Sequence, residues 1–473
     1  MILLRFSVRF IGFISTIILA RLLVPEDFGL VALATIIAGL LEVVSEFNFA
    51  IYLIKKQDAD RSYYDTAWTL TLLRGFAIAA LLAIGAHQAS VFFEKSELEA
   101  IIYCLALASL VEGFSNVGTV DFRKQLQFDR EFRFMLYMRL VAFVVTLGLA
   151  FLIRNYWALV AGLASGKIAM VFLSYGMHPY RPRWCLSRSA EILAFSKWLL
   201  FNQGILFFSR RADVFVIGKV AGPGALGLYS VGQEIAMLAS SELVMPIHRA
   251  LLPGYARLAD DMKGLRRAYT TGLSLILMLA LPVAAGIALV AEPLVSVALG
   301  SKWLETVPLI QVLVIAGLLQ LFRANTHPML IAMGVPQLTT AIAAAVAVTA
   351  IPLLVWWTPI GGAYAAAWAI TLATGVGVIL NLLVIVGVAK IGIGEITKAI
   401  WRSLASTLSM VIAVRFGLQW VAALDCSELL TLCFGVLIGI LSYASTHALL
   451  WYVSGKPEGS ERHFVNAVQD ALL

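Results

Sequence analysis

The sequence predicts an all-α integral membrane protein of about fourteen transmembrane helices: two six-helix lobes related by a parallel repeat, followed by two C-terminal helices. Three observations predict this fold class. Of the 473 residues, 61% are hydrophobic and only 13% are charged, which is too few charges for the surface of a soluble domain. Apolar runs of about 18 to 25 residues, the length that a helix needs to cross a bilayer, recur from end to end. A turn pattern that follows the first run also returns one block of six helices later.

The first lobe is predicted over residues 1–177 and contains six spans. Each span is an apolar run that ends where charged residues, proline or glycine interrupt it. No small-residue cleavage site follows the first run, so we expect an uncleaved helix there rather than a signal peptide. The six spans are residues 3–23, 29–53, 67–89, 98–120, 134–153 and 157–175.

The second half follows the same rules. A polar segment, residues 178–197, is predicted to be a cytoplasmic linker between the lobes. The second lobe is predicted over residues 198–389, and residues 390–473 contain the last two spans and a cytoplasmic tail. The spans of these two regions are residues 198–220, 225–247, 270–290, 307–321, 338–357, 363–388, 404–421 and 430–453.

Lysine and arginine distinguish the two sides of the membrane. The loops that follow even-numbered spans are rich in both, as in "DFRKQLQFDREFRF" after the fourth span. The loops on the opposite side contain only Arg21, Lys95, Arg154, Lys219 and Lys302. Because basic loops stay in the cytoplasm, both termini are predicted to be cytoplasmic. The net charge of +7 then reflects this bias and not a nucleic-acid surface.

The repeated pattern is a turn between two helices. "ARLLVPEDFGL", which begins at residue 20, is matched by "GKVAGPGALGL", which begins at residue 218. The alignment places Arg21 on Lys219, Pro25 on Pro223 and Gly29 on Gly227. A block with an even number of helices ends on the side of the membrane where it began, so a second copy has the same orientation. The two copies should therefore be related by an axis along the membrane normal. The alternative is that such turns arise wherever short loops join spans.

Charged residues inside the predicted spans indicate where the function resides. Each costs about 2.5 to 3.5 kcal/mol on insertion scales, so each requires a partner, a cavity or an interface. They concentrate in the first, second, seventh and eighth spans, which predicts a polar central cavity between the lobes. Candidates for binding an anionic group are Arg9, Arg210 and Arg211, because the planar guanidinium suits phosphate. Candidates for charge balance, or for coupling to Na⁺ or H⁺, are Glu42, Glu46, Asp213, Glu234 and Glu242.

Structural roles compete with these assignments. Arg210 and Asp213 could form an i,i+3 ion pair, and Arg9 could extend to the cytoplasmic interface. The remaining charges inside spans are assigned to packing between lobes or to interfaces. They are Arg74, Glu112, Arg139, Lys167 and Arg415.

Several stretches resemble a known family, among them "ILARLLVPEDFGLVALA", "YYDTAWTLTLLRG", "DFRKQLQFDREFRF" and "LLPGYARL". They resemble the polysaccharide transporter family of lipopolysaccharide and exopolysaccharide biosynthesis, in the multidrug/oligosaccharidyl-lipid/polysaccharide exporter superfamily. The resemblance implies a flippase of the bacterial cytoplasmic (inner) membrane. Such a protein moves an undecaprenyl-diphosphate-linked oligosaccharide from the inner to the outer leaflet by alternating access, with polysaccharide polymerase and export machinery as possible partners. It also implies that cavity-facing arginines hold the diphosphate, a role that falls on Arg9, Arg210 and Arg211, whereas the second span offers carboxylates instead.

Two other functions stay open. A cation-coupled multidrug exporter would share the lobes but favour an apolar, acidic cavity, against which Arg210 and Arg211 argue. A membrane glycan polymerase or acyltransferase would require a long outer loop or a histidine in catalytic spacing, and the six histidines are isolated. The four cysteines show no CxxC or Cys/His spacing. We therefore expect no enzyme activity, no catalytic residues, no metal site and no cofactor beyond a coupling cation.

Overall fold

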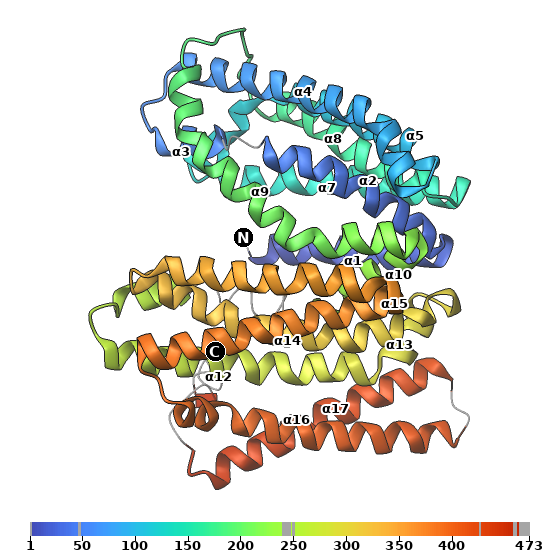
Figure 1. Cartoon of the computed structure of the whole chain (residues 1–473), viewed down its shortest axis with the longest axis vertical. Coiled ribbons are helices and arrows are strands. Elements are labelled where there is room, and N and C mark those ends of the chain that lie inside the picture. Colours follow the sequence, from blue (N-terminus) through green and yellow to red (C-terminus); the bar gives the residue numbers. More distant parts are fainter. Residues whose placement is uncertain are drawn as a thin grey trace. The chain divides into compact units, whose positions relative to one another are not determined.

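The computed structural model of the chain is helical, with no strand among the residues it describes (Figure 1). It describes residues 2–45, 49–238, 247, 251–424, 427–456 and 461–462, and their side chains except those of residues 2–10, 44, 50, 194–206 and 208–210. Helices are what an apolar chain must form in a bilayer, because lipid offers no hydrogen-bond partner to the backbone. The all-α part of the predicted fold class is confirmed.

Many of the helices are long enough to cross a membrane. Within the described residues, eight are both long and apolar enough, and a bent pair of helices at residues 97–124 raises the number to nine. The chain is therefore a multi-pass membrane protein. The number of fourteen spans and the orientation of the termini stay predictions.

The chain forms two compact units, Met1–Ser230 and Val231–Leu473. The predicted lobes and linker, with their boundaries at residues 177, 197 and 389, stay predictions. In the first unit, α2 packs against α5 and α9, α5 against α4 and α8, and α7 against α1 and α8. Its helices are α1 (Ile2–Leu22), α2 (Pro25–Val44), α3 (Phe49–Lys55), α4 (Arg61–Phe93), α5 (Glu97–Glu112), the 3-10 turn η1 (Val117–Val120), α6 (Asp121–Lys124), α7 (Phe128–Ile153), α8 (Trp157–Met177), α9 (Ser189–Val220) and α10 (Gly222–Ala236), which extends into the second unit.

Two predicted spans are not continuous helices. The helix predicted at 29–53 ends at Val44, where Ser45 has a non-helical backbone conformation, and α3 is described from Phe49. The helix predicted at 98–120 ends at Glu112, and the chain bends by 76° before η1 and α6. The side chain of Asn116 starts η1 by accepting the Gly118 N–H at 2.9 Å. An N-cap of this kind begins a new helix in a new direction.

In the second unit, α12 packs against α14 and α16, α14 against α15, and α16 against α17. Gly362, with φ of 58°, breaks the long helix α15 in two, which separates the predicted spans 338–357 and 363–388 as expected. The elements are α12 (Met262–Leu289), α13 (Ala291–Ala298), the 3-10 turn η2 (Ser301–Thr306), α14 (Val307–Ala332), α15 (Pro336–Val384), the π-helical turn η3 (Ile385–Ala389), α16 (Ile393–Ala422) and α17 (Glu428–Val453).

Candidate functional site

A cluster of charged side chains lies inside the first unit, where α2, α5 and α8 meet. Lys167 on α8 forms ion pairs with Glu42 on α2 and, at 2.7 Å, with Glu112 on α5. The Ser109 hydroxyl lies 3.1 Å from the Lys167 ammonium and donates to Glu42 Oε1 at 3.1 Å. Lys167 is 22% exposed and its partners Glu42 and Glu112 are 31% and 38% exposed, so one ammonium holds two carboxylates together in a partly buried place.

Arg74 of α4 completes this cluster. Its Nη2 donates to the backbone carbonyl of Glu42 at 2.8 Å, and its Nε to Ser45 Oγ at 3.1 Å. The last carbonyls of a helix carry partial negative charge, so a guanidinium at the end of α2 is favourable. With two acidic and two basic side chains, the cluster is electrically balanced, as charges at membrane depth require.

The cluster corrects one part of the sequence analysis. Arg74, Glu112 and Lys167 were assigned to packing between lobes or to interfaces. Instead, Arg74 and Lys167 contact Glu42 and Glu112 pairs with Lys167, all inside one unit. The reason is that α5 and α8 pack on each other and on α2. A signal existed in the sequence: Glu42, Glu112 and Lys167 all lie 10 to 14 residues beyond the first residues (29, 98 and 157) of spans that run in the same direction.

Asp213, another candidate, is buried between α9 and α10. It is 5% exposed, and its Oδ2 accepts the Tyr229 hydroxyl at 2.8 Å. Arg211 and Glu234 are exposed. The side chains of Arg9, Arg210, Glu46 and Glu242 lie outside the described part of the chain. The assignments of diphosphate ligands and of coupling carboxylates therefore stay predictions. Asp213 is buried and hydrogen-bonded to Tyr229.

The two repeated turns touch each other through their glycines. A Cβ added to Gly29 would lie 1.7 Å from the carbonyl oxygen of Pro223, and one added to Gly227 would lie 1.8 Å from that of Pro25. Each glycine therefore packs directly on the backbone of the other turn. Since the contacts are reciprocal between aligned residues, they have the pattern that a local two-fold relation produces.

Ion pairs reinforce the same end of the unit. The Lys219 ammonium pairs with Glu94 at 2.8 Å and donates to the Phe92 carbonyl at 2.6 Å, which joins the end of α9 to the end of α4. Lys95 pairs with Glu26 at 2.8 Å, which joins the same end of α4 to the start of α2. Both pairs are partly exposed, so each contributes at most about 1 kcal/mol.

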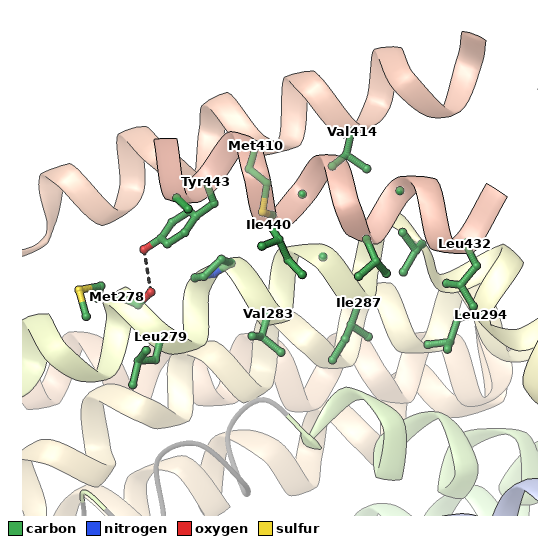
Figure 2. Close-up of a pocket in the computed structure, with 17 residues that line it drawn as sticks. Met278, Leu279, Val283, Ile287, Leu294, Met410, Val414, Leu432, Ile440 and Tyr443 are labelled. Carbon is green, nitrogen blue, oxygen red and sulfur yellow. Dashed lines mark hydrogen bonds between the residues drawn. The ribbon is translucent and has the colours of Figure 1, made fainter. Parts of the chain in front are cut away.

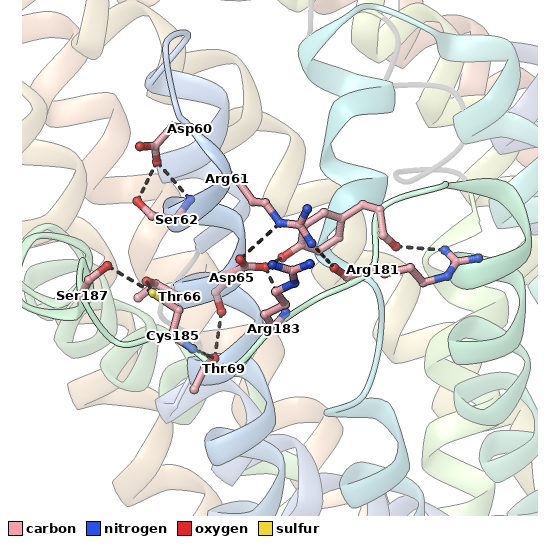
Figure 3. Close-up of polar contacts among 11 residues, drawn as sticks. Asp60, Arg61, Ser62, Asp65, Thr66, Thr69, Arg181, Arg183, Cys185 and Ser187 are labelled. Atoms are coloured by element: carbon pink, nitrogen blue, oxygen red, sulfur yellow. Dashed lines mark hydrogen bonds and ion pairs between the residues drawn. The ribbon is translucent and has the colours of Figure 1, made fainter.

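At the opposite end of α4, hydrogen bonds hold residues 178–188, which follow α8, against this helix (Figure 3). We call residues 178–188 the strap. Buried Asp65 accepts the Tyr180 hydroxyl at 2.5 Å and the Arg183 N–H at 3.0 Å, and it pairs with Arg61 at 3.5 Å. Thr69 accepts the Cys185 N–H at 3.1 Å. Residues 178–188 are therefore held by hydrogen bonds along one side of α4.

The strap continues into the first turn of α9. Glu191 accepts hydrogen bonds from Tyr52 at 2.5 Å, Tyr63 at 2.8 Å and Lys56 at 3.1 Å. These hydrogen bonds lower the pKa of Glu191 to about 2, so its carboxylate stays charged at any physiological pH. The buried side chain of Ile192 packs in the same cluster as Tyr52 and Tyr63.

Asp65→Asn is expected to loosen the strap. The substitution replaces charge-assisted hydrogen bonds by weaker ones, a loss of about 2 kcal/mol. Trypsin should then cleave faster after Arg183 in purified protein. Asp58→Asn, an exposed position next to α4, is the control and should leave the cleavage rate unchanged.

Similarity to known proteins agrees with this architecture. A family model described as "Polysaccharide biosynthesis protein" matches residues 18–308. A Klebsiella pneumoniae protein described as an uncharacterized membrane protein in the cps region is 23% identical over 376 residues, 78% of each chain. The lipopolysaccharide biosynthesis protein WzxC of Escherichia coli (strain K12) is 24% identical over 66% of this chain and 64% of its own length, less than two thirds.

Among solved structures, a lipid II flippase, MurJ, in an inward closed conformation is similar in fold. The TM-score is 0.75 at 14% identity, over 95% of this chain and 98% of that one. At this identity the likeness concerns the fold alone. It extends over nearly the whole chain and therefore includes both units.

Proposed function

This chain belongs to the family of polysaccharide biosynthesis proteins, and from that membership we propose that it is a flippase for a lipid-linked oligosaccharide. The substrate is an undecaprenyl-diphosphate-linked oligosaccharide, moved from the inner to the outer leaflet of the bacterial cytoplasmic membrane by alternating access. The observation that most supports the proposal is the similarity in fold, over 95% of the chain, to a lipid II flippase. A relative named as a lipopolysaccharide biosynthesis protein supports it further.

The physical problem is the polar head of the substrate. A glycan with many hydroxyls and a diphosphate cannot cross hydrocarbon unaided, because each unpaired polar group costs several kcal/mol. A polar cavity that opens to one side at a time removes that barrier, while the polyprenyl tail stays in lipid. Arg9, Arg210 and Arg211 are the proposed diphosphate ligands, because bidentate guanidinium–phosphate pairs are strong and directional.

The charge cluster is the proposed coupling site, and its composition favours H⁺ over Na⁺. The Lys167 ammonium already lies between the carboxylates of Glu42 and Glu112, in the position that a bound metal cation would need. A proton can instead add to one carboxylate and release the ammonium from it. Removal of one charge from a balanced buried cluster changes how its helices pack, which is how protonation would act on the transport cycle.

The proposal predicts that Arg210→Ala combined with Arg211→Ala abolishes export of surface glycan while the protein stays in the membrane. Two guanidinium groups that bind the diphosphate cannot be replaced by methyl groups. The measurement is surface glycan in cells, together with the amount of membrane-inserted protein. Arg133→Ala, which removes an exposed arginine from an exposed ion pair, is the matched control.

Normal export by the double variant would contradict the diphosphate role. A cation-coupled multidrug exporter, the alternative function, predicts that result together with altered resistance to cationic drugs. Reconstitution in vesicles with a labelled lipid-linked glycan, scored by the exposure of its sugar on the far leaflet, separates the two functions directly.

A further inference from the structure

A carboxylate that follows α17 in the chain is buried in the second unit. Glu461, located after α17, is only 6% exposed. Arg402 of α16 donates to Glu461 Oε1 from both Nε and Nη2, at 2.7 Å each. The Arg402 side chain is itself 12% exposed, so this is a desolvated ion pair between a helix and the tail. Buried pairs of this kind add little net stability, which invites a functional explanation.

His447 lies beside this pair, and its Nε2 makes no hydrogen bond to Glu461. Its Nε2 is 3.6 Å from Glu461 Oε1, too far for a hydrogen bond, and that nitrogen is buried with no hydrogen-bond partner in the described part of the chain. Its Nδ1 is 3.3 Å from Ser406 Oγ. A guanidinium fork and an imidazole thus face one anion, while the Ser406 hydroxyl donates to the Arg402 carbonyl at 2.7 Å and lies beside the imidazole. A phosphate, with more acceptor oxygens than a carboxylate, could satisfy both Arg402 and His447.

An apolar cavity of about 580 Å³ adjoins this place (Figure 2). It lies among α12, α16 and α17, and Tyr443 lines one end of it. The Tyr443 ring stacks on the ring of His447, with centroids 5.3 Å apart, and its hydroxyl donates to the Met278 carbonyl at 2.7 Å. Along α17 the lining extends from Leu432 to Ala444, a rise of 12 residues or about 18 Å of helix. That length suits an acyl chain.

We propose that Arg402 and His447 bind the phosphate of an anionic membrane lipid, whose acyl chain lies in the adjoining apolar cavity, and that Glu461 competes with this phosphate for the site. The site is distinct from the substrate cavity and does not depend on the proposed flippase activity. It lies near the start of α16 and the end of α17, the side predicted to face the cytoplasmic leaflet, where anionic lipids attract basic residues. Glu461 is thus displaced when lipid binds.

A change of pH in the physiological range does not displace Glu461 from the site. Burial raises the pKa of Glu461, but the His447 and Arg402 side chains outweigh this effect and lower it to about 2. The ion pair is therefore complete above the unfolded pKa of about 4.3 and is lost only as the pH falls toward 2. At physiological pH, release requires a competing anion.

The test is retention of phosphatidylglycerol by the purified full-length protein, measured by native mass spectrometry. Glu461→Gln, which removes the competing charge at constant shape, should raise retention about tenfold. The double variant Glu461→Gln, Arg402→Gln replaces both partners by neutral amides, so it should fold and should lose that gain. Glu428→Gln and Arg415→Gln, exposed positions on the same two helices, are the controls.

Two further arms distinguish a lipid from free phosphate. Gly439→Leu fills the apolar cavity, because a Cβ there meets only ordinary contacts at 3.5 Å or more. It should reduce phosphatidylglycerol retention in the Glu461→Gln background, and inorganic phosphate should compete only weakly. Equal retention by wild type and Glu461→Gln overturns the competition. If Arg402→Gln leaves phosphatidylglycerol retention unchanged, the proposed site is wrong. If Gly439→Leu leaves retention unchanged and inorganic phosphate competes equally well, the assignment to a lipid is wrong.

Discussion

Lys167→Met is expected to destabilise the protein by about 3 kcal/mol and to abolish export. The substitution leaves the carboxylates of Glu42 and Glu112 without their shared cation at membrane depth. Removal of one partner from a buried ion pair costs about 3 to 5 kcal/mol, because an uncompensated charge stays behind. The partial exposure of the cluster places the expected value at the low end of that range. Thermal unfolding in detergent and surface glycan in cells are the two measurements.

The triple variant Lys167→Met, Glu42→Gln, Glu112→Gln separates the structural role of the cluster from its functional one. The variant leaves no unpaired carboxylate, and Arg74 keeps its hydrogen bonds to the backbone carbonyl of residue 42 and to Ser45, so most of the lost stability should return. Export should stay absent, since no group is left to take up a proton. Lys302→Met, at an exposed lysine, controls for the loss of one positive charge. Unchanged stability of Lys167→Met would contradict the stabilising role of the ion pairs in the cluster. Normal export by the triple variant would contradict the coupling role of its carboxylates.

Much of the helical architecture could be predicted from the sequence because it depends on local properties. Apolar runs set the helices, and residues such as Gly362 set the breaks between them. The end of α2 at Val44 and the bend after Glu112 were missed, since both lie in segments that are apolar enough to be predicted as continuous helices. Hydropathy averages over a window of residues, whereas one capping side chain such as Asn116 decides where a helix restarts.

The candidate site could be predicted only in part. Glu42 was identified because a carboxylate in an apolar run is costly wherever it lies. Its partners could not be assigned, because pairing depends on how α2, α5 and α8 rotate and which faces they bury. Lys167 and Glu112 were visible as charges but not as a pair. A contact between helices is a tertiary property, and a common depth in the membrane narrows the choice without fixing it.

The repeated turn also shows that the sequence predicts local structure but not the contacts between distant segments. The alignment of Pro25 with Pro223 and of Gly29 with Gly227 predicted two similar turns. It did not predict that each glycine would pack on the other turn's proline carbonyl. Glycine at the start of a helix is usually explained by local backbone needs. Here its missing Cβ allows two backbones to approach.

Gly29→Ala and Gly227→Ala are each expected to separate the two turns where their glycines meet, a contact that we call the crossing. The expected cost is about 3 kcal/mol, or a shift of about 100-fold in the equilibrium between crossed and separated turns. The added Cβ atoms would lie 1.7 and 1.8 Å from backbone oxygens, which cannot rotate away as a side chain could. Gly224→Ala is the matched control, because a Cβ at that position meets nothing within 4 Å.

Export and thermal unfolding, measured together, show what the crossing does. If the turns stay together throughout the transport cycle, both glycine variants lower the melting temperature and export falls with the amount of folded protein. If the crossing opens in one state, as alternating access requires of one end of the molecule, export falls while the melting temperature barely changes, because the separated state is itself native. The reciprocal geometry demands equal effects from the two variants. A strong defect in Gly29→Ala beside a harmless Gly227→Ala would therefore exclude the paired crossing, whichever of the two roles it has.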